Sequence, residues 1–361
     1  MKQNTDNGAK ALLERLEETS FFTHYSMLGD GNVRQYDWEK IGAKLTGLER
    51  RLWDFLLVGQ ALAPKEAAAL LGEPALNFLL RHKLCTKAKG KLSLGLYRLV
   101  RYWGLCLFIE RPSAATYIGD DTKALLACLP RRTGGRCLSL FSAGGLEVLP
   151  LAASGMELDF VGLKASEGVL RANLELNAAA GAAPHWQFPS RSSGKYDLMV
   201  SNPPYLFEPA GVKMPKYAAG GPDGLKCVRT FLKTASTQLN PDGLAIASFA
   251  FFADVEAPAM EQRLRAFLAP YGLNYELAIS SKLLMEPGVP VFNQVLSMAV
   301  SGSATPPNMD VLVKKTMACI KRKQFGAAHL LKGRFWKGGK GQPAEQQITN
   351  YSSSYYGTWI I

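Results

Sequence analysis

The feature that most constrains the fold is a rigid turn that directly follows an apolar run. Residues Tyr196 to Val200 form a short, mostly apolar segment of the kind that makes a buried parallel strand, and Asn202 and two prolines soon follow it. Each proline fixes its own φ and lacks an N–H group, so the carbonyl groups between Asn202 and Tyr205 point in set directions with few competing donors. We therefore expect the turn at the carboxyl edge of an open α/β sheet, where such sheets bind their ligands.

The turn offers the acceptors that a planar NH₂ group needs. The nitrogen of an amide or of an exocyclic amino group is a poor nucleophile because its lone pair is delocalised. The Asn202 side-chain oxygen and the Pro203 carbonyl are suited to accept its two hydrogens and aim the lone pair at an electrophile, while Tyr205 supplies a flat face. The predicted catalytic residues are Asn202, Pro203, Pro204 and Tyr205. The alternative is a Pro-Pro loop that Asn202 merely caps.

The Asn202-Pro203-Pro204-Tyr205 motif resembles the signature of S-adenosyl-L-methionine-dependent methyltransferases that act on amide or amino nitrogens. A second block, Gly220 to Leu225 followed by Arg229 and by Leu239 to Gly243, is similar to that of the protein-glutamine methyltransferases that modify release factors. The resemblance implies a class I enzyme with a doubly wound, Rossmann-like α/β domain and S-adenosyl-L-methionine as cofactor. It also implies that Gly220 to Leu225 is a loop that closes over the active site.

The cofactor site that the resemblance implies departs from the family pattern. Ser139 and Lys164 stand where the family usually has an acid, Phe141 stands where it usually has a glycine, and no acid occurs near Gln187. Moving the alignment to Asp159 restores an acid, but in mid-strand. The residues implied around the cofactor are Asp121, Thr122, Ser139, Phe141, Ala143, Gly145, Lys164, Gln187 and Asn202. For Asp121 and Thr122, capping of the following helix is an equally good explanation.

The replaced acids leave three interpretations open. The chain binds S-adenosyl-L-methionine in an atypical way, or it binds a variant with an extra negative charge that pairs with Lys164, or it is a catalytically inactive methyltransferase-like binding module. The retained turn favours an enzyme. Its favoured substrate is a protein glutamine side chain, and the alternative is the amino group of adenine or guanine in a nucleic acid.

Composition and hydrophobic periodicity divide the chain into three parts. Residues 1–112 are predicted to form a helical, winged-helix-like domain, with helices at 8–19, 45–58, 65–71 and 74–82 and a basic-tipped hairpin at 85–100. Because the helix at 74–82 is mostly apolar, docking or substrate positioning is favoured over nucleic-acid binding. Residues 113–305 are predicted to form the Rossmann-like domain, which an antiparallel pair at 275–279 and 295–300 completes. Residues 306–361 are predicted to form a basic C-terminal segment.

The charge pattern indicates an anionic partner. The net charge is +12, and residues 306–361 hold nine basic residues against Asp310 and Glu345. The expected partners are a protein substrate or the ribosome and its RNA, with nucleic-acid contact through the basic segment. Phe335 and Trp336 lie between cations in that segment and suit stacking on bases, although anchoring to the protein body explains them equally well.

Cysteine usage indicates a reducing compartment. The six cysteines include no Cys-x-x-Cys pair and the chain has only four histidines, so we predict free thiols, a cytoplasmic location and no metal site. No run approaches 18 apolar residues, so no membrane association is expected.

Overall fold

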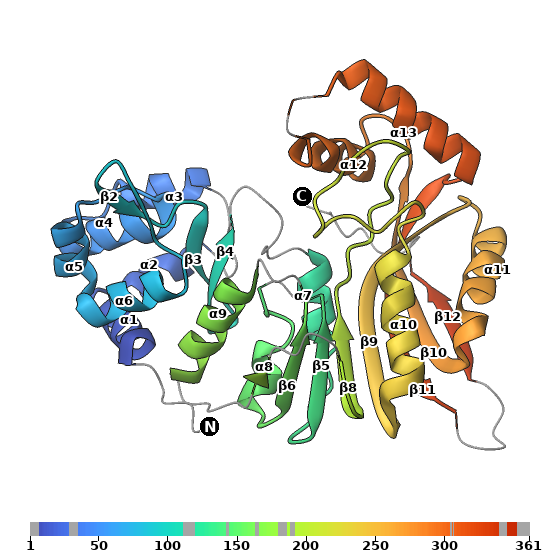
Figure 1. Ribbon diagram of the computed structural model, residues 1–361, viewed down its shortest axis with the longest axis horizontal. Coiled ribbons are helices and arrows are strands. Elements are labelled where there is room, and N and C mark those ends of the chain that lie inside the picture. The colour runs from blue at the N-terminus through green and yellow to red at the C-terminus, as the bar shows by residue number, and fades with distance from the viewer. Residues whose placement is uncertain are drawn as a thin grey trace.

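The computed structural model describes residues 7–28, 35–110, 120–141, 144–162, 166–179, 186–187, 192–303, 305, 307–338 and 345–351. Its centre is an eight-stranded sheet with helices on both faces (Figure 1). The order across the sheet is β12-β10-β11-β9-β8-β5-β6-β7. These strands are β5 (Arg136–Leu140), β6 (Glu157–Val161), β7 (Trp186–Gln187), β8 (Tyr196–Ser201), β9 (Leu239–Ala253), β10 (Leu273–Leu284), β11 (Ala327–Lys337) and β12 (Gln346–Asn350).

The strand directions confirm the predicted doubly wound, Rossmann-like α/β fold. Strand β5 pairs in parallel with β6 and with β8, and β8 pairs in parallel with β9. Strand β11 is antiparallel to both β9 and β10. Because the strand order reverses between β5 and β8, the topological switch point lies at the carboxyl ends of these two strands, where such sheets bind ligands.

In the middle of the sheet, at β8, the two faces contact two different hydrophobic cores. Leu198 and Val200 of β8 face a core that contains residues of three helices, whereas Met199 faces a second core. The helices of the first core are α7 (Asp120–Ala127), α8 (Leu149–Ala153) and α9 (Glu167–Ala179), and α10 (Lys226–Gln238) and α11 (Ala257–Leu268) contribute to the second. The alternation follows from the two-residue period of a strand.

The N-terminal region forms a helical module, and it carries two hairpins where the sequence predicted one at 85–100. Its helices are α1 (Asn7–Glu17), α2 (Phe21–Ser26), α3 (Gln35–Gly42), α4 (Gly47–Trp53), the π-helical turn η1 (Asp54–Val58), α5 (Pro64–Leu71) and α6 (Glu73–Arg81). Its hairpins pair β1 (Thr86–Ala88) with β2 (Lys91–Ser93) and β3 (Tyr97–Tyr102) with β4 (Leu105–Glu110). The predicted domain boundary at 112/113 lies outside the described residues.

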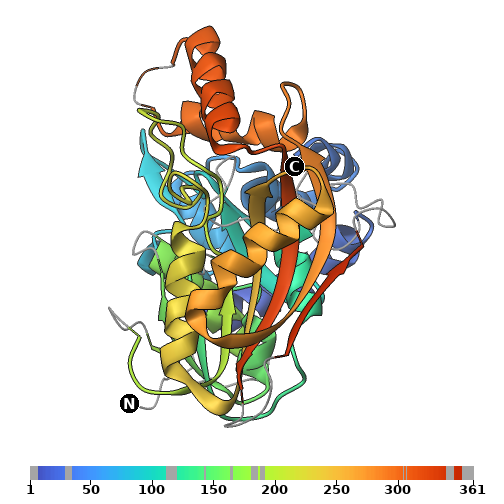
Figure 2. The same ribbon diagram turned by 90° about the vertical axis from the view of Figure 1, so that its right-hand side faces the viewer.

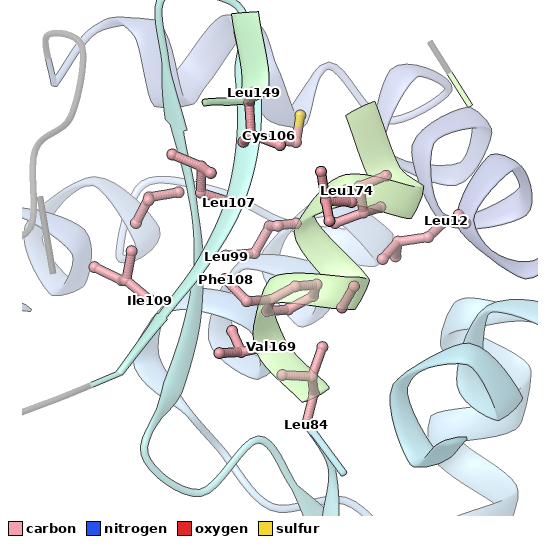
Figure 3. Close-up of a cluster of buried hydrophobic side chains, with 14 of the residues drawn as sticks. Leu12, Leu84, Leu99, Cys106, Leu107, Phe108, Ile109, Leu149, Val169 and Leu174 are labelled. Carbon is pink, nitrogen blue, oxygen red and sulfur yellow. The ribbon is translucent and has the colours of Figure 1, made fainter. Parts of the chain in front are cut away.

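The N-terminal module is packed against α9 and shares a core with it. Leu12 of α1, Phe108 of β4 and Leu174 of α9 lie in one cluster of buried side chains (Figure 3). At the end of α6, Arg81 and His82 both contact the Glu175 carboxylate on α9, at 2.8 and 3.1 Å. The docking or substrate-positioning role predicted for the helix at 74–82 stays a prediction.

The predicted separate C-terminal segment, residues 306–361, is wrong. Strand β11 lies inside the sheet between β9 and β10, and β12 pairs in parallel with β10. Phe335 is fully buried in β11, so of the two explanations of this aromatic the hydrophobic anchor is confirmed. The basic residues at 314–323 lie instead on a helix, α13 (Met309–Lys323).

The predicted strand at 295–300 is also wrong, because these residues belong to helix α12 (Pro290–Ser301). Val291, Val295 and Ala299 are buried at intervals of four residues, which is the period of a helix that packs one face on a core. The antiparallel partner of β10 is β11. Within the described residues, no helix is long and apolar enough to cross a membrane.

Candidate functional site

The turn from Asn202 to Tyr205 lies at the switch point of the sheet. Strand β8 ends at Ser201, whose hydroxyl donates a hydrogen bond to the Leu140 carbonyl at the end of β5, at 2.9 Å. This bond ties the carboxyl ends of the two strands together. The turn therefore occupies the position that the sequence predicts for it.

The Asn202 side chain is oriented by two residues at the start of α7. Its NH₂ group donates hydrogen bonds to Asp121 Oδ2 and to Thr122 Oγ1, both at 3.0 Å. Its oxygen is buried and, among the described residues, has no hydrogen-bond partner. Because a buried polar atom normally has a partner, the described residues leave the accepting capacity of this oxygen unused.

The Asp121 carboxylate accepts hydrogen bonds from other groups besides the Asn202 side chain. Its side chain is 4% exposed, its Oδ2 accepts a hydrogen bond from the Tyr205 hydroxyl at 3.2 Å, and its Oδ1 accepts one from the Thr122 amide at 2.8 Å. The carboxylate lies in the first turn of α7, where the helix dipole favours a negative charge. Asp121 and Thr122 thus contact the catalytic turn itself. Their predicted contact with a cofactor stays a prediction.

Tyr205 has its hydroxyl bound and most of its ring covered. The residue is 7% exposed and belongs to the second core, next to Leu206 and Phe207. The hydrogen bond to Asp121 links the last residue of the turn to the group that orients Asn202. The predicted stacking of a substrate on Tyr205 stays a prediction, and the structure adds a positioning contact that the sequence did not indicate.

The loop that contains Gly220 to Leu225 packs against the backbone of the turn. The Gly220 amide donates to the Leu206 carbonyl at 2.7 Å. Gly224 has a φ of +78°, and a Cβ atom there would lie 2.4 Å from the Tyr205 carbonyl oxygen. The glycine is required for this close approach. Its contact with the backbone of the turn supports the prediction that this block belongs to the active site.

The turn after β5 is held by α9. The Asn173 side chain donates a hydrogen bond to the Gly144 carbonyl at 2.8 Å. Gly145 has a φ of +79°, and a Cβ atom there would lie 2.4 Å from Leu170 of α9, so this glycine permits close helix packing. Phe141 also has a positive φ, +66°. Ala143 lies outside the described residues.

Ser139 stands in β5 where the resembling family usually has an acid. It is 1% exposed, and its hydroxyl has no hydrogen-bond partner within the described ranges. An unpartnered buried hydroxyl indicates a site completed by a bound group. This is consistent with the predicted cofactor contact, which the structure by itself leaves as a prediction.

Asp159 is committed to a structural network in the middle of the sheet. It accepts hydrogen bonds from the Arg136 guanidinium at 2.8 Å and from the Tyr196 hydroxyl at 2.7 Å. Burial, and next the bond to Asp159, raise the pKa of the Tyr196 hydroxyl to about 12. Asp159 therefore does not replace the missing acid at the end of β6. Lys164 and the side chain of Gln187 lie outside the described residues, although the Gln187 backbone pairs with Asp159 in the sheet.

Comparison with known proteins gives one curated relative and several distant structures. No family model matches the chain. The chain is 35% identical over 112 residues to a tRNA1(Val) (adenine(37)-N6)-methyltransferase of Serratia proteamaculans, which covers 28% of this chain and 43% of the relative. The chain thus spans less than half the length of that relative.

The solved structures are only distantly similar to this chain. A methyltransferase from Pyrococcus furiosus is 14% identical with a TM-score of 0.37, over 66% of this chain and 91% of that one. A SAM-dependent methyltransferase from Thiobacillus denitrificans, in complex with S-adenosyl-L-homocysteine, is 13% identical with a TM-score of 0.34, over 61% and 91%. Likeness at this level carries no conclusion about activity.

Proposed function

We propose that the chain is an S-adenosyl-L-methionine-dependent methyltransferase that acts on a planar amino nitrogen. The observation that carries the proposal is the unpartnered, buried oxygen of Asn202 at the switch point of the sheet. Since both hydrogens of the Asn202 amide are used by Asp121 and Thr122, only an acceptor remains for the substrate. An acceptor at this position suits an N–H donor and disfavours a substrate that offers only oxygen lone pairs.

The residues of the turn perform the reaction by positioning. Asn202 Oδ1 and the Pro203 carbonyl accept the two hydrogens of the substrate NH₂ group, which turns the nitrogen lone pair toward the methyl donor. S-adenosyl-L-methionine supplies, when bound, a methyl group already activated for attack by nitrogen. The bound cofactor would supply the methyl group, with its sulfur as the leaving group, to the nitrogen held by Asn202 and Pro203, and the nitrogen would then lose its proton to solvent. Positioning of this kind accounts for large rate factors without a metal ion or a covalent nucleophile.

The residues present fit the cofactor in part. The turn after β5 and the unpartnered Ser139 hydroxyl are the groups that we assign to it, together with Asp121, Thr122, Phe141 and Gly145. Ala143, Lys164 and Gln187 remain in the proposed set on the basis of their positions in the sequence. With a serine in place of an acid in β5, we expect the affinity for the cofactor to depend mainly on backbone groups.

We propose the amino group of a nucleic-acid base as the substrate. Similarity to a tRNA adenine-N6 methyltransferase and a net charge of +12 both support this choice over a protein glutamine. The glutamine side chain, favoured by the Gly220 to Leu225 block, is the second candidate. Incubation with radiolabelled S-adenosyl-L-methionine and either bulk tRNA or a cell extract freed of RNA distinguishes the two.

Asn202→Ala tests the proposal. We expect the rate of methyl transfer to fall by about 100-fold or more, as when one preorganised hydrogen bond is removed from an active site. Cofactor affinity, measured by calorimetry, should stay within about twofold. Asn293→Ala, which changes an exposed asparagine of α12, is the control and should leave both quantities unchanged. A wild-type protein that binds no S-adenosyl-L-methionine, or an Asn202→Ala variant with full rate, would refute the proposal.

A further inference from the structure

A pocket of about 500 Å³ lies between the segment that follows the catalytic turn and the helices α12 and α13. Its walls include Gly211 and Lys213 from that segment, Gly302 at the end of α12, and Asn308 and Lys315 of the α13 region. A pocket of this volume is large enough for a phosphate group with its attached sugar. The residues that line the pocket therefore determine which kind of ligand it can bind.

The charge of the pocket lining is entirely positive. Lys213 and Lys315 are its charged residues, and no acidic side chain lines it. Within the part of the chain that the structure describes, neither lysine takes part in an ion pair or a side-chain hydrogen bond. The hydroxyl-bearing residues Ser303 and Thr305 also line the pocket. Two cations without counter-ions beside hydroxyl groups suit an anion with several acceptor oxygens.

The two lysines belong to different segments of the pocket wall. The Lys315 ammonium comes from α13 and lies 3.7 Å from the position that a Cβ atom on Gly211 would occupy. Lys213 comes from the segment that follows the catalytic turn, and a Cβ atom on Gly302 would lie 2.7 Å from the Lys213 carbonyl oxygen. The end of α12 is thus packed directly against the segment that bears Lys213. This contact fixes the position of one wall of the pocket, the end of α12, relative to the segment that bears Lys213.

The pocket is also connected to the proposed catalytic turn. Gly211 follows Asn202 by nine residues, and the loop between them is anchored at Leu206 by two backbone hydrogen bonds, at 2.7 and 3.2 Å. Helices α12 and α13 connect β10 to β11 and lie beyond the same edge of the sheet as the turn (Figures 1 and 2). The pocket and the turn thus lie beyond the same edge of the sheet.

We infer that this pocket binds a backbone phosphate of a nucleic-acid substrate while the target base is held at Asn202. The inference rests on the proposed function, because it names the partner of the same site. A base that enters an active site must leave its stack, and its flanking phosphates then need fixed cationic partners. Lys213 and Lys315 are those partners, and the Thr305 hydroxyl supplies a neutral donor.

The test measures the affinity of the full-length protein for bulk tRNA across a range of salt concentrations. For the double variant Lys213→Gln/Lys315→Gln, we expect binding at about 100 mM salt to weaken roughly tenfold. We also expect the slope of log K against log salt to become shallower by about 0.7 to 0.9, the contribution of one phosphate contact. The matched control is Lys314→Gln/Lys321→Gln, which removes the same charge from α13 outside the pocket and should change the slope by less than half as much.

Two results would overturn the inference. Equal effects in the two double variants would show diffuse attraction by α13 with no localised site. Loss of inorganic phosphate binding in the pocket variant, with its tRNA slope unchanged, would show a site for a free anion. Melting temperatures of all variants verify that each is folded. Methyl transfer is measured separately: if the wild type transfers no methyl group but the tRNA slope depends on the pocket lysines, the binding site stands and only the proposed function fails.

Discussion

The orientation of one amide, that of Asn202, determines what the catalytic turn accepts. An asparagine presents either two donors or an acceptor to a ligand, depending on which end of its amide is held by the protein. Here Asp121 and Thr122 both accept from the NH₂ end, and the oxygen is left for the ligand. The proposed selectivity for an N–H substrate thus depends on a carboxylate that lies 81 residues earlier in the chain.

Asp121→Asn tests this dependence. An asparagine at 121 offers an NH₂ group of its own, so the Asn202 amide is free to rotate and to present a donor to the substrate. We expect the turnover rate to fall roughly 10- to 100-fold, the equivalent of one hydrogen bond to a charged group. The dissociation constant of S-adenosyl-L-methionine, measured by calorimetry, should change by less than about threefold. A large loss of cofactor affinity with an unchanged turnover rate would instead identify Asp121 as a cofactor ligand.

Among the secondary-structure elements, α9 connects the N-terminal module to the proposed cofactor turn. Asn177 accepts a hydrogen bond from the Cys106 amide at 3.0 Å and donates one to its carbonyl at 2.8 Å. Asn173 makes the same pair of bonds to Phe108, at 2.7 and 3.1 Å. Two side chains one turn apart thereby satisfy backbone groups of β4 in the way that a neighbouring strand would. Asn173 alone also reaches Gly144.

The two asparagines are a matched pair for experiment. Each change to alanine leaves a backbone N–H and a carbonyl of β4 without their partner, so we expect the free energy of unfolding to fall by about 1–3 kcal/mol in both variants. Only Asn173→Ala should weaken S-adenosyl-L-methionine binding, because only Asn173 holds the turn after β5. Urea unfolding and calorimetry measure the two effects. Equal cofactor affinities in the two variants would contradict the link.

The reactivity of the Cys106 thiol reports whether β4 stays packed on α9. Cys106 is 7% exposed, and burial raises the pKa of its thiol to about 12, so it should react slowly with thiol reagents in the native protein. Faster modification of Cys106 in Asn177→Ala than in the wild type would show that β4 has loosened from α9. The half-buried Cys128 and Cys227 supply the rate of accessible thiols for comparison.

In the molecule as a whole, the segment after α12 and α13 adds two further strands, β11 and β12, to the central sheet. Strands β11 and β12 come from the last 35 residues of the 361-residue chain, yet β11 separates β9 from β10. Leu330, Leu331 and Phe335 of β11 are buried in the second core. The helices that line the proposed phosphate site, α12 and α13, lie in the chain between β10 and β11. Both ends of this helical segment are therefore fixed by strands of the sheet.

A chain that ends at residue 305 should therefore fail to fold. Without β11, strands β9 and β10 lose a partner and the second core loses its buried side chains, so we expect no cooperative thermal transition by circular dichroism. The control is the full chain with Lys321→Gln, Arg322→Gln and Lys323→Gln, which removes positive charge from α13 and keeps every strand; it should melt within a few degrees of the wild type. A shortened chain with a native melting transition would restore the independent C-terminal segment.

The sequence by itself determined the features that depend on neighbouring residues. The run from Tyr196 to Val200 and the two prolines after Asn202 specify a buried strand and a rigid turn, because apolar pattern and φ restriction are local properties. The doubly wound arrangement was what the resemblance of the Asn202 to Tyr205 motif to methyltransferases implied.

Only the tertiary structure decided the features that depend on contacts between distant residues. It assigned Asp159 to Arg136 and Tyr196, Asp121 to Asn202, and residues 327–337 to the interior of the sheet. A carboxylate that orients an amide and one that balances a guanidinium are the same residue type in the sequence. What separates them is the set of donors that folding brings within about 3 Å, and hydrogen bonding acts only over that range.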